Sequence, residues 1–168
     1  MKTKVRLIVV TLICSIIGIT EAQSQNSQKS ISNNINLKVM APKEVVLAYA
    51  EALGKGDIPT AFSFFSPEAK WHQPGAHQFA GIKSGTDEIG KMLGGMMEAA
   101  KGTFAIKPNG NIMVNGNFVA MPVRFSGTID DRKIDMTGID LFEVSNGKII
   151  GVWLFSENQE VEDTFWGK

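Results

Sequence analysis

Apolar residues recur with a helical period in the first part of the chain that follows its polar N-terminal stretch. A stripe beginning after Pro42 and ending at Gly54 predicts a first helix, and its members are Val45, Val46, Tyr49, Ala52 and Leu53. Asp57 is a suitable N-cap for a second, short helix that ends before Pro67. A third helix should open at Thr86 and end at Gly102.

The later part of the chain follows the period of strands instead. A brief strand is expected over 69–73, and after Gly102 we expect strands over 103–107, 111–114, 117–129, 132–145 and 148–156. Asn115-Gly116 and Asn146-Gly147 are typical hairpin turns. Helices followed by a long antiparallel meander predict an α+β fold, in which the helices pack on one face of a curved sheet.

The N-terminus has the pattern of an export signal. Three basic residues precede an apolar run over 7–19 that is short for a membrane span, and Thr20 and Ala22 suit a signal-peptidase site. We therefore expect a signal peptide over 1–22 and an exported protein, periplasmic or secreted, with no membrane anchor after cleavage. Residues 23–41 are rich in Gln, Asn and Ser and predict a disordered tether, and 42–168 form one globular domain.

Charge and cysteine content exclude several function classes. Removal of 1–22 takes away three basic residues and one acidic residue, which changes 17 against 17 into 14 basic against 16 acidic. This balance argues against nucleic-acid binding, which needs clustered Lys and Arg. Cys14, the one cysteine, lies in the predicted signal peptide, so the mature chain has no thiol for catalysis or a disulfide.

One acidic residue interrupts an otherwise apolar strand face. Alternation over 132–145 places Asp140 with Ile134, Met136, Phe142 and Val144. A carboxyl group there needs a partner or a raised pKa, and such groups are enriched in functional sites. The alternative is a bulge at Gly138 that would turn Asp140 to the outer face.

Three sequence stretches resemble a known family. VVLAYAEALGKGD (45–57), AKWHQPG (69–75) and GIDLFEVSNGKIIGVW (138–153) are similar to the ketosteroid isomerases and SnoaL-like polyketide cyclases of the nuclear-transport-factor-2-like superfamily. The resemblance covers nearly all of 42–168. It implies a cone-shaped, curved antiparallel sheet wrapped around helices, in the order ααβαββββ, with one pocket for a small hydrophobic molecule.

The resemblance also implies roles for particular residues. Tyr49 falls where the isomerases have their oxyanion-hole tyrosine, and Asp140 falls where they have an aspartic acid that donates a second hydrogen bond. Together these donors would stabilise an enolate. Gln73 stands at the position of the general base, where an amide cannot accept the proton. His72 is the neighbouring candidate base, although alternation sends it to the opposite face from Trp71 and Gln73.

Several aromatic and apolar residues are expected to line the pocket. They are Phe65, Trp71, Met121, Phe125, Phe142, Trp153 and Phe155. No cofactor is needed for this chemistry. His72 and His77 lack a third ligand at a defined spacing, so we expect no metal site.

Two functions remain open at this point. The first is an isomerase or cyclase that acts on an apolar carbonyl compound by stabilising an enolate. The second is a secreted, non-catalytic module that binds a hydrophobic ligand in the same pocket, as the loss of the base at Gln73 would allow. A further titratable group in the pocket would favour the enzyme.

The outer face of the strand over 132–145 bears on the oligomeric state. Thr137, Ile139 and Leu141 make this face apolar enough to suggest a homodimer formed by sheet-to-sheet packing.

Overall fold

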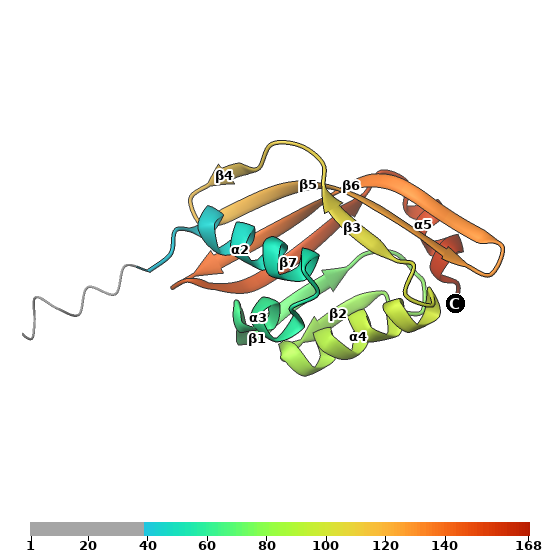
Figure 1. Ribbon diagram of the computed structural model, residues 1–168, viewed down its shortest axis with the longest axis horizontal. Helices are drawn as coiled ribbons and strands as arrows, with labels where there is room; N and C mark the ends of the chain where they lie inside the picture. The colour runs from blue at the N-terminus through green and yellow to red at the C-terminus, as the bar shows by residue number, and fades with distance from the viewer. Residues whose placement is uncertain (1–38) are drawn as a thin grey trace, which may run out of the picture. The chain divides into compact units, whose positions relative to one another are not determined.

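Four helices pack against a seven-stranded sheet in the computed structural model, which describes residues 39–168 (Figure 1). The helices are α2 (Pro42–Gly54), α3 (Ile58–Ser63), α4 (Gly85–Ala99) and α5 (Gln159–Trp166). The strands are β1 (Phe65–Gln73), β2 (Gly81–Ser84), β3 (Ala105–Pro108), β4 (Met113–Asn115), β5 (Phe118–Ile129), β6 (Arg132–Ser145) and β7 (Lys148–Ser156). The predicted signal peptide and nearly all of the predicted tether lie outside the described residues.

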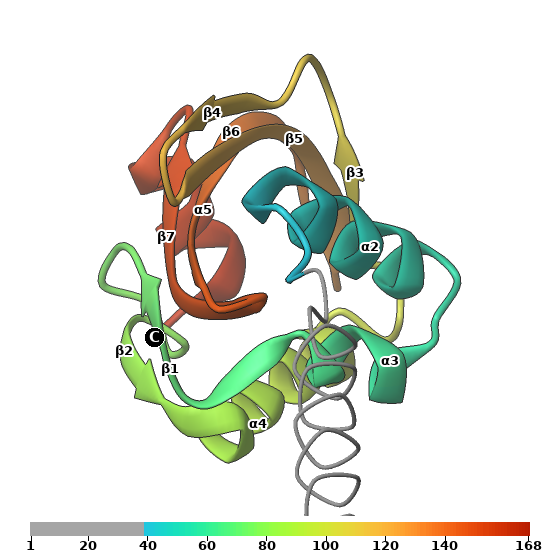
Figure 2. The ribbon, with the colours of Figure 1, turned by 90° about the vertical axis from the view of Figure 1, so that its left-hand side faces the viewer.

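The sheet is strongly curved and has α2 on its concave side (Figure 2). Its strand order is β2-β1-β7-β6-β5-β3, and β4 also pairs with β5. Helix α2 packs against β5, β6 and β7, whereas α4 packs against β1 and β2. The predicted α+β fold with a curved sheet around helices is confirmed. One pair departs from the expected antiparallel pattern, since β1 and β7 run parallel.

Strand alternation supplies the core on the concave face. The side chains of Ile134, Met136, Phe142 and Val144 are all buried on one face of β6. No register shift occurs at Gly138, so the alternation continues through it and Asp140 lies on the buried face. The alternative of a bulge at Gly138 is therefore wrong.

Local chemistry explains where several elements begin and turn. The Asp57 carboxylate accepts a hydrogen bond from the Thr60 N–H at 3.1 Å, which caps α3 as expected. Asn146 and Gly147 have φ angles of 50° and 74°, as a two-residue hairpin turn requires. At Gly138 a Cβ atom would lie 2.6 Å from the Phe155 carbonyl oxygen, so only glycine allows β6 and β7 to approach there.

Two elements and one boundary differ from the prediction. Strand β1 begins at Phe65 rather than at 69, and the short edge strand β2 was not expected. Helix α5 was also missed, although Asn158 caps it by accepting a hydrogen bond from the Val161 N–H at 3.2 Å. Within residues 39–168, no helix combines the length and apolar character needed to cross a membrane.

The core predicts a clear difference between two Phe→Ala substitutions in the sheet. Phe142 is fully buried, so Phe142→Ala should lower the free energy of unfolding by about 3–5 kcal/mol. Phe118 is 40% exposed, and Phe118→Ala should cost under about 1.5 kcal/mol. Urea unfolding followed by circular dichroism measures both. Equal losses would contradict this placement of the core.

Candidate functional site

A cavity of about 40 Å³ lies among residues from the sheet, α4 and α5. Its wall is mainly apolar and is formed by Trp71, Leu93, Met96, Phe104, Ile106, Val123, Phe125, Leu154, Phe155 and Trp166. Four polar residues complete it, namely Gln73, Asp140, Ser156 and Glu162. This volume accommodates about three water molecules. A ring-containing ligand therefore needs wall side chains such as Leu93 and Met96 to move aside.

Asp140 brings a carboxyl group into this apolar wall. Asp140 is 8% exposed, and burial raises the pKa of its carboxyl group from 3.8 to about 7. The negative charge of Glu162 is the second cause, and no hydrogen bond from a described residue counteracts the two. Near neutral pH, Asp140 is thus protonated in a large fraction of molecules and can donate a hydrogen bond.

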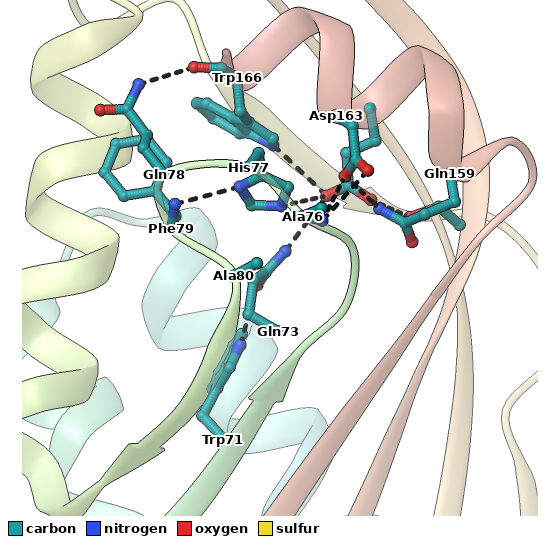
Figure 3. Close-up of polar contacts among 12 residues, drawn as sticks. Trp71, Gln73, Ala76, His77, Gln78, Phe79, Ala80, Gln159, Asp163 and Trp166 are labelled. Atoms are coloured by element: carbon teal, nitrogen blue, oxygen red, sulfur yellow. Dashed lines mark hydrogen bonds and ion pairs between the residues drawn. The ribbon is translucent and has the colours of Figure 1, made fainter. Parts of the chain in front are cut away.

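Glu162 is a second carboxyl group in the same cavity, carried by α5. Its Oε1 accepts hydrogen bonds from Gln73 Nε2 at 3.1 Å and from Trp166 Nε1 at 3.3 Å. Its Oε2 accepts from Gln159 Nε2 at 3.2 Å and from the Ser156 hydroxyl. Figure 3 labels three of these donors, Gln73, Gln159 and Trp166, around the loop between β1 and β2. Burial raises the pKa of Glu162, while hydrogen bonds from the helix and β7 oppose that rise.

Gln73 connects the first strand to the last helix. Its Oε1 accepts a hydrogen bond from Trp71 Nε1 at 3.1 Å, and its Nε2 donates to Glu162. Trp71 can only donate, so this bond determines the orientation of the Gln73 amide. Gln73 therefore accepts from Trp71 on its own strand (Figure 3) and holds a carboxylate of the last helix in place.

His77 lies beside Glu162 in the loop between β1 and β2. Its Nδ1 accepts a hydrogen bond from the Phe79 N–H at 3.2 Å, so Nε2 carries the proton in the neutral ring. Nε2 has no hydrogen-bond partner among the described residues and lies 4.0 Å from Glu162 Oε1. Burial lowers the pKa of His77, and the negative charge of Asp163 partly opposes this.

Tyr49 is buried but does not border the cavity. Its ring packs edge-on against Phe65 and Phe142, at centroid distances of 5.4 and 5.7 Å. Burial raises the pKa of Tyr49, and the charge of Asp140 adds to this effect. The phenol and the acid therefore interact electrostatically within one core, while Asp140 alone of the two reaches the cavity.

His72 and Trp153 occupy the opposite face of the sheet. Their rings stack at a centroid distance of 4.8 Å, on the side away from Trp71 and Gln73. His72 is thus removed from the cavity as a candidate base, and the prediction of Trp153 as a lining residue is corrected. The reason is strand alternation, which turns Leu154 inward and Trp153 outward.

The remaining predicted lining residues divide into two groups. Trp71, Phe125 and Phe155 border the cavity. Phe155 pairs with Ile139, lies on the outer face of the sheet and is 56% exposed. Three others lie in the core outside the cavity wall, and these are Phe65, Met121 and Phe142. Among the described residues, no group of three His, Cys, Asp or Glu side chains could hold a metal ion.

Glu162 and Trp166 are site residues that were not predicted, because both lie on α5, which was not predicted either. The available signal was Asn158 followed by Val161 and Phe165, which is a capped start with apolar residues four apart.

The raised pKa of Asp140 predicts a pH-dependent stability. Because the folded state holds this proton up to about pH 7 and the unfolded state loses it near 3.8, the free energy of unfolding should fall as pH rises between these values. The slope is on the order of 1.4 kcal/mol per pH unit. Asp140→Asn should flatten it in urea unfolding series from pH 4 to 8.

Asp135→Asn provides the control for this measurement. Asp135 is exposed on the same strand and bonded to Arg124, which holds its pKa below the usual range. Its replacement should leave the slope between pH 4 and 7 in place. Parallel curves for wild type and Asp140→Asn would contradict the assignment.

The fold can be compared with known proteins. A protein of unknown function with a cystatin-like fold from Xanthomonas campestris is 42% identical, with a TM-score of 0.73, over 77% of this chain and all of its own. TerC, co-crystallised with polyporic acid, is 18% identical with a TM-score of 0.62, over 70% of this chain and 92% of its own. An uncharacterised protein of Mycobacterium tuberculosis is 24% identical over 115 residues, which are 68% of this chain and 88% of its own.

The family model of the SnoaL-like domain matches residues 46–152, which run from within α2 to the middle of β7. The resemblance found in the sequence is thereby confirmed. Together with the curved sheet, these matches show that the chain belongs to the SnoaL-like family.

Proposed function

We propose that this protein is an isomerase or cyclase that binds a small apolar carbonyl compound in the cavity. The observation that carries the proposal is Asp140, a buried carboxyl group with a pKa of about 7 in a mainly apolar cavity wall. In its neutral form Asp140 donates a hydrogen bond to the carbonyl oxygen. That oxygen gains negative charge when a proton leaves the neighbouring carbon, so the bond strengthens as the reaction proceeds.

Tyr49 supports Asp140 from within the core. Its pKa is raised by burial, so the phenol remains neutral at physiological pH. Since Tyr49 does not border the cavity, we assign the direct contact with the substrate oxygen to Asp140. Tyr49 then acts as a positioning residue that influences the environment of Asp140.

The aromatic wall favours a ring-containing substrate. Trp71, Phe104, Phe125 and Trp166 present large apolar surfaces with few competing polar atoms. The co-crystallisation of TerC with polyporic acid is consistent with a small organic ligand in this fold. Leu93 and Met96 on α4 are the side chains that must yield, and the flexibility of methionine suits that role.

The second candidate is a ligand-binding module without catalysis. Such a module needs the apolar wall but has no use for two carboxyl groups, whose burial costs stability. Glu162 lines the cavity in addition to Asp140. A second titratable group at this point favours the enzyme.

Turnover of a β,γ-unsaturated ketone tests the proposed activity. Wild type should convert it to the conjugated isomer, and Asp140→Asn should lower kcat by about 10²-fold or more because the weaker amide donor replaces the acid. Tyr49→Phe should have a smaller effect. Absorbance of the conjugated product follows the reaction. Equal rates for wild type and Asp140→Asn would contradict the mechanism. Ligand binding without turnover would favour the non-catalytic binding module.

We also propose that a second copy of the chain covers the outer face of the sheet. Cross-strand pairing places a row of mainly apolar side chains there, formed by Ile82, His72, Trp153, Leu141 and Ala120. Ile139 and Phe155, which pair beside this row, are 38% and 56% exposed. A face of this kind, repeated in an identical partner, fits a two-fold symmetric dimer.

Ile139→Lys tests this dimer. The added charges would lie in the buried contact, so light scattering should give a dimer for wild type and a monomer for the variant. Leu47→Lys on α2 is the matched control, because Leu47 is 46% exposed and lies away from this face. A monomeric wild type at high concentration would reject the proposal.

A further inference from the structure

We propose that Glu162 is the general base of this site and that Gln73 positions it. The inference rests on the proposed function, because it names the group that removes the proton from the substrate carbon. It assigns the base to the last helix, α5, whereas the related isomerases carry it on the first strand. Gln73 occupies that strand position and supplies a hydrogen bond to the replacement.

Geometry places Glu162 where a base is needed. Its carboxyl group lines the same cavity as Asp140, so a ligand whose oxygen meets Asp140 has Glu162 as the other carboxyl group in the wall. The remaining polar members of the wall are Gln73 and Ser156, which do not accept a proton at neutral pH. Glu162 is therefore the proton acceptor that the cavity offers.

The hydrogen bonds distribute the charge between the two acids. Glu162 accepts bonds from Gln73, Ser156, Gln159 and Trp166, each of which favours its ionised form. Asp140 receives no hydrogen bond from the described residues to favour ionisation. Two carboxyl groups in one apolar cavity resist double ionisation, so the proton resides on Asp140 and the charge on Glu162. The pair thus contains one acid and one base.

The other charged groups facing Glu162 leave this arrangement intact. Asp163 on α5 adds negative charge, which raises the proton affinity of Glu162. His77 approaches Glu162 Oε1 to 4.0 Å through Nε2, and burial lowers its pKa, so the ring is neutral at physiological pH. Glu162 is therefore not neutralised by an ion pair and retains its basicity.

The step balances within the site. The C–H bond beside the carbonyl breaks, its proton passes to a Glu162 carboxylate oxygen, and its electron pair forms a carbon–carbon double bond as the carbonyl electrons move onto oxygen. Asp140 donates a hydrogen bond to that oxygen. Return of the proton from Glu162 to a different carbon reforms the carbonyl and completes the isomerisation. No oxidant, reductant or further reactant is consumed.

The pH dependence of kcat/KM for the unsaturated ketone tests this assignment. Wild type should give a bell-shaped profile. The rate should fall in acid as Glu162 becomes protonated, because its pKa is raised above the ordinary value of 4.5. It should fall in base as Asp140 ionises, because the pKa of Asp140 is about 7. Glu162→Gln should lower kcat by about 10²- to 10⁴-fold. Binding of 2-naphthol, a phenol that mimics the enolate, should remain.

Three further variants separate a base from a merely structural residue. Glu160→Gln makes the same change at an exposed position of α5 and should behave as wild type. Glu162→Asp should keep the acidic limb of the pH profile, because a carboxylate is still present. Its rate should be lower, because the side chain is one methylene shorter and holds the carboxylate farther from the substrate. Gln73→Leu removes a donor to the ionised carboxylate, so its acidic limb should move to higher pH.

The outcomes distinguish the two proposals. If wild type turns over the ketone and folded Glu162→Gln is equally active, Glu162 is not the base while the proposed function stands. If wild type has no turnover, the proposed function fails, and the assignment of Glu162 as its base fails with it. If Glu162→Gln does not fold, the wild-type profile and the shift in Gln73→Leu decide, and an acidic limb absent above pH 4.5 overturns the assignment.

Discussion

The hydrogen bond from the Gln73 amide to the Glu162 carboxylate joins the end of β1 to α5, and both residues line the cavity. Without it, these two parts of the cavity wall would lose a polar contact, and a buried carboxylate would lose a partner. Trp71 and Trp166 extend the contact on either side, so the polar connection is enclosed by indole rings. The low polarity of this enclosure makes each bond matter, because a lost partner cannot be replaced by bulk water.

Two carboxyl groups share this interior without a cation to pair with them among the residues lining the cavity. Their environments differ in one respect that decides their ionisation. Glu162 is surrounded by donors, whereas Asp140 is surrounded by apolar side chains and the charge of Glu162. The protein therefore tolerates a destabilising pair in its core. Proteins commonly retain such a destabilising arrangement at functional sites, where groups with shifted pKa values are needed.

Much of the fold could be predicted because its long strands have strict alternation and clear turn signals. The bounds of β6 and β7 agree with the predicted 132–145 and 148–156, and the same alternation placed Asp140 on the inner face. Helix α5 could not be predicted as clearly as the long strands, since eight residues with few apolar positions resemble a polar tail. Glu162 became recognisable only when its neighbours from β1 and β7 were known. Trp153 was misplaced because aromatic residues were grouped by type and alternation was not applied to them.

The parallel pairing of β1 with β7 has a consequence for how the chain folds. These strands are separated by more than half of the described sequence, so their contact closes a long loop and carries a high entropic cost. The cavity wall includes residues of both β1 and β7, so it is incomplete until these two distant strands have paired. The β5–β6 hairpin, by contrast, needs only contacts between neighbouring parts of the chain.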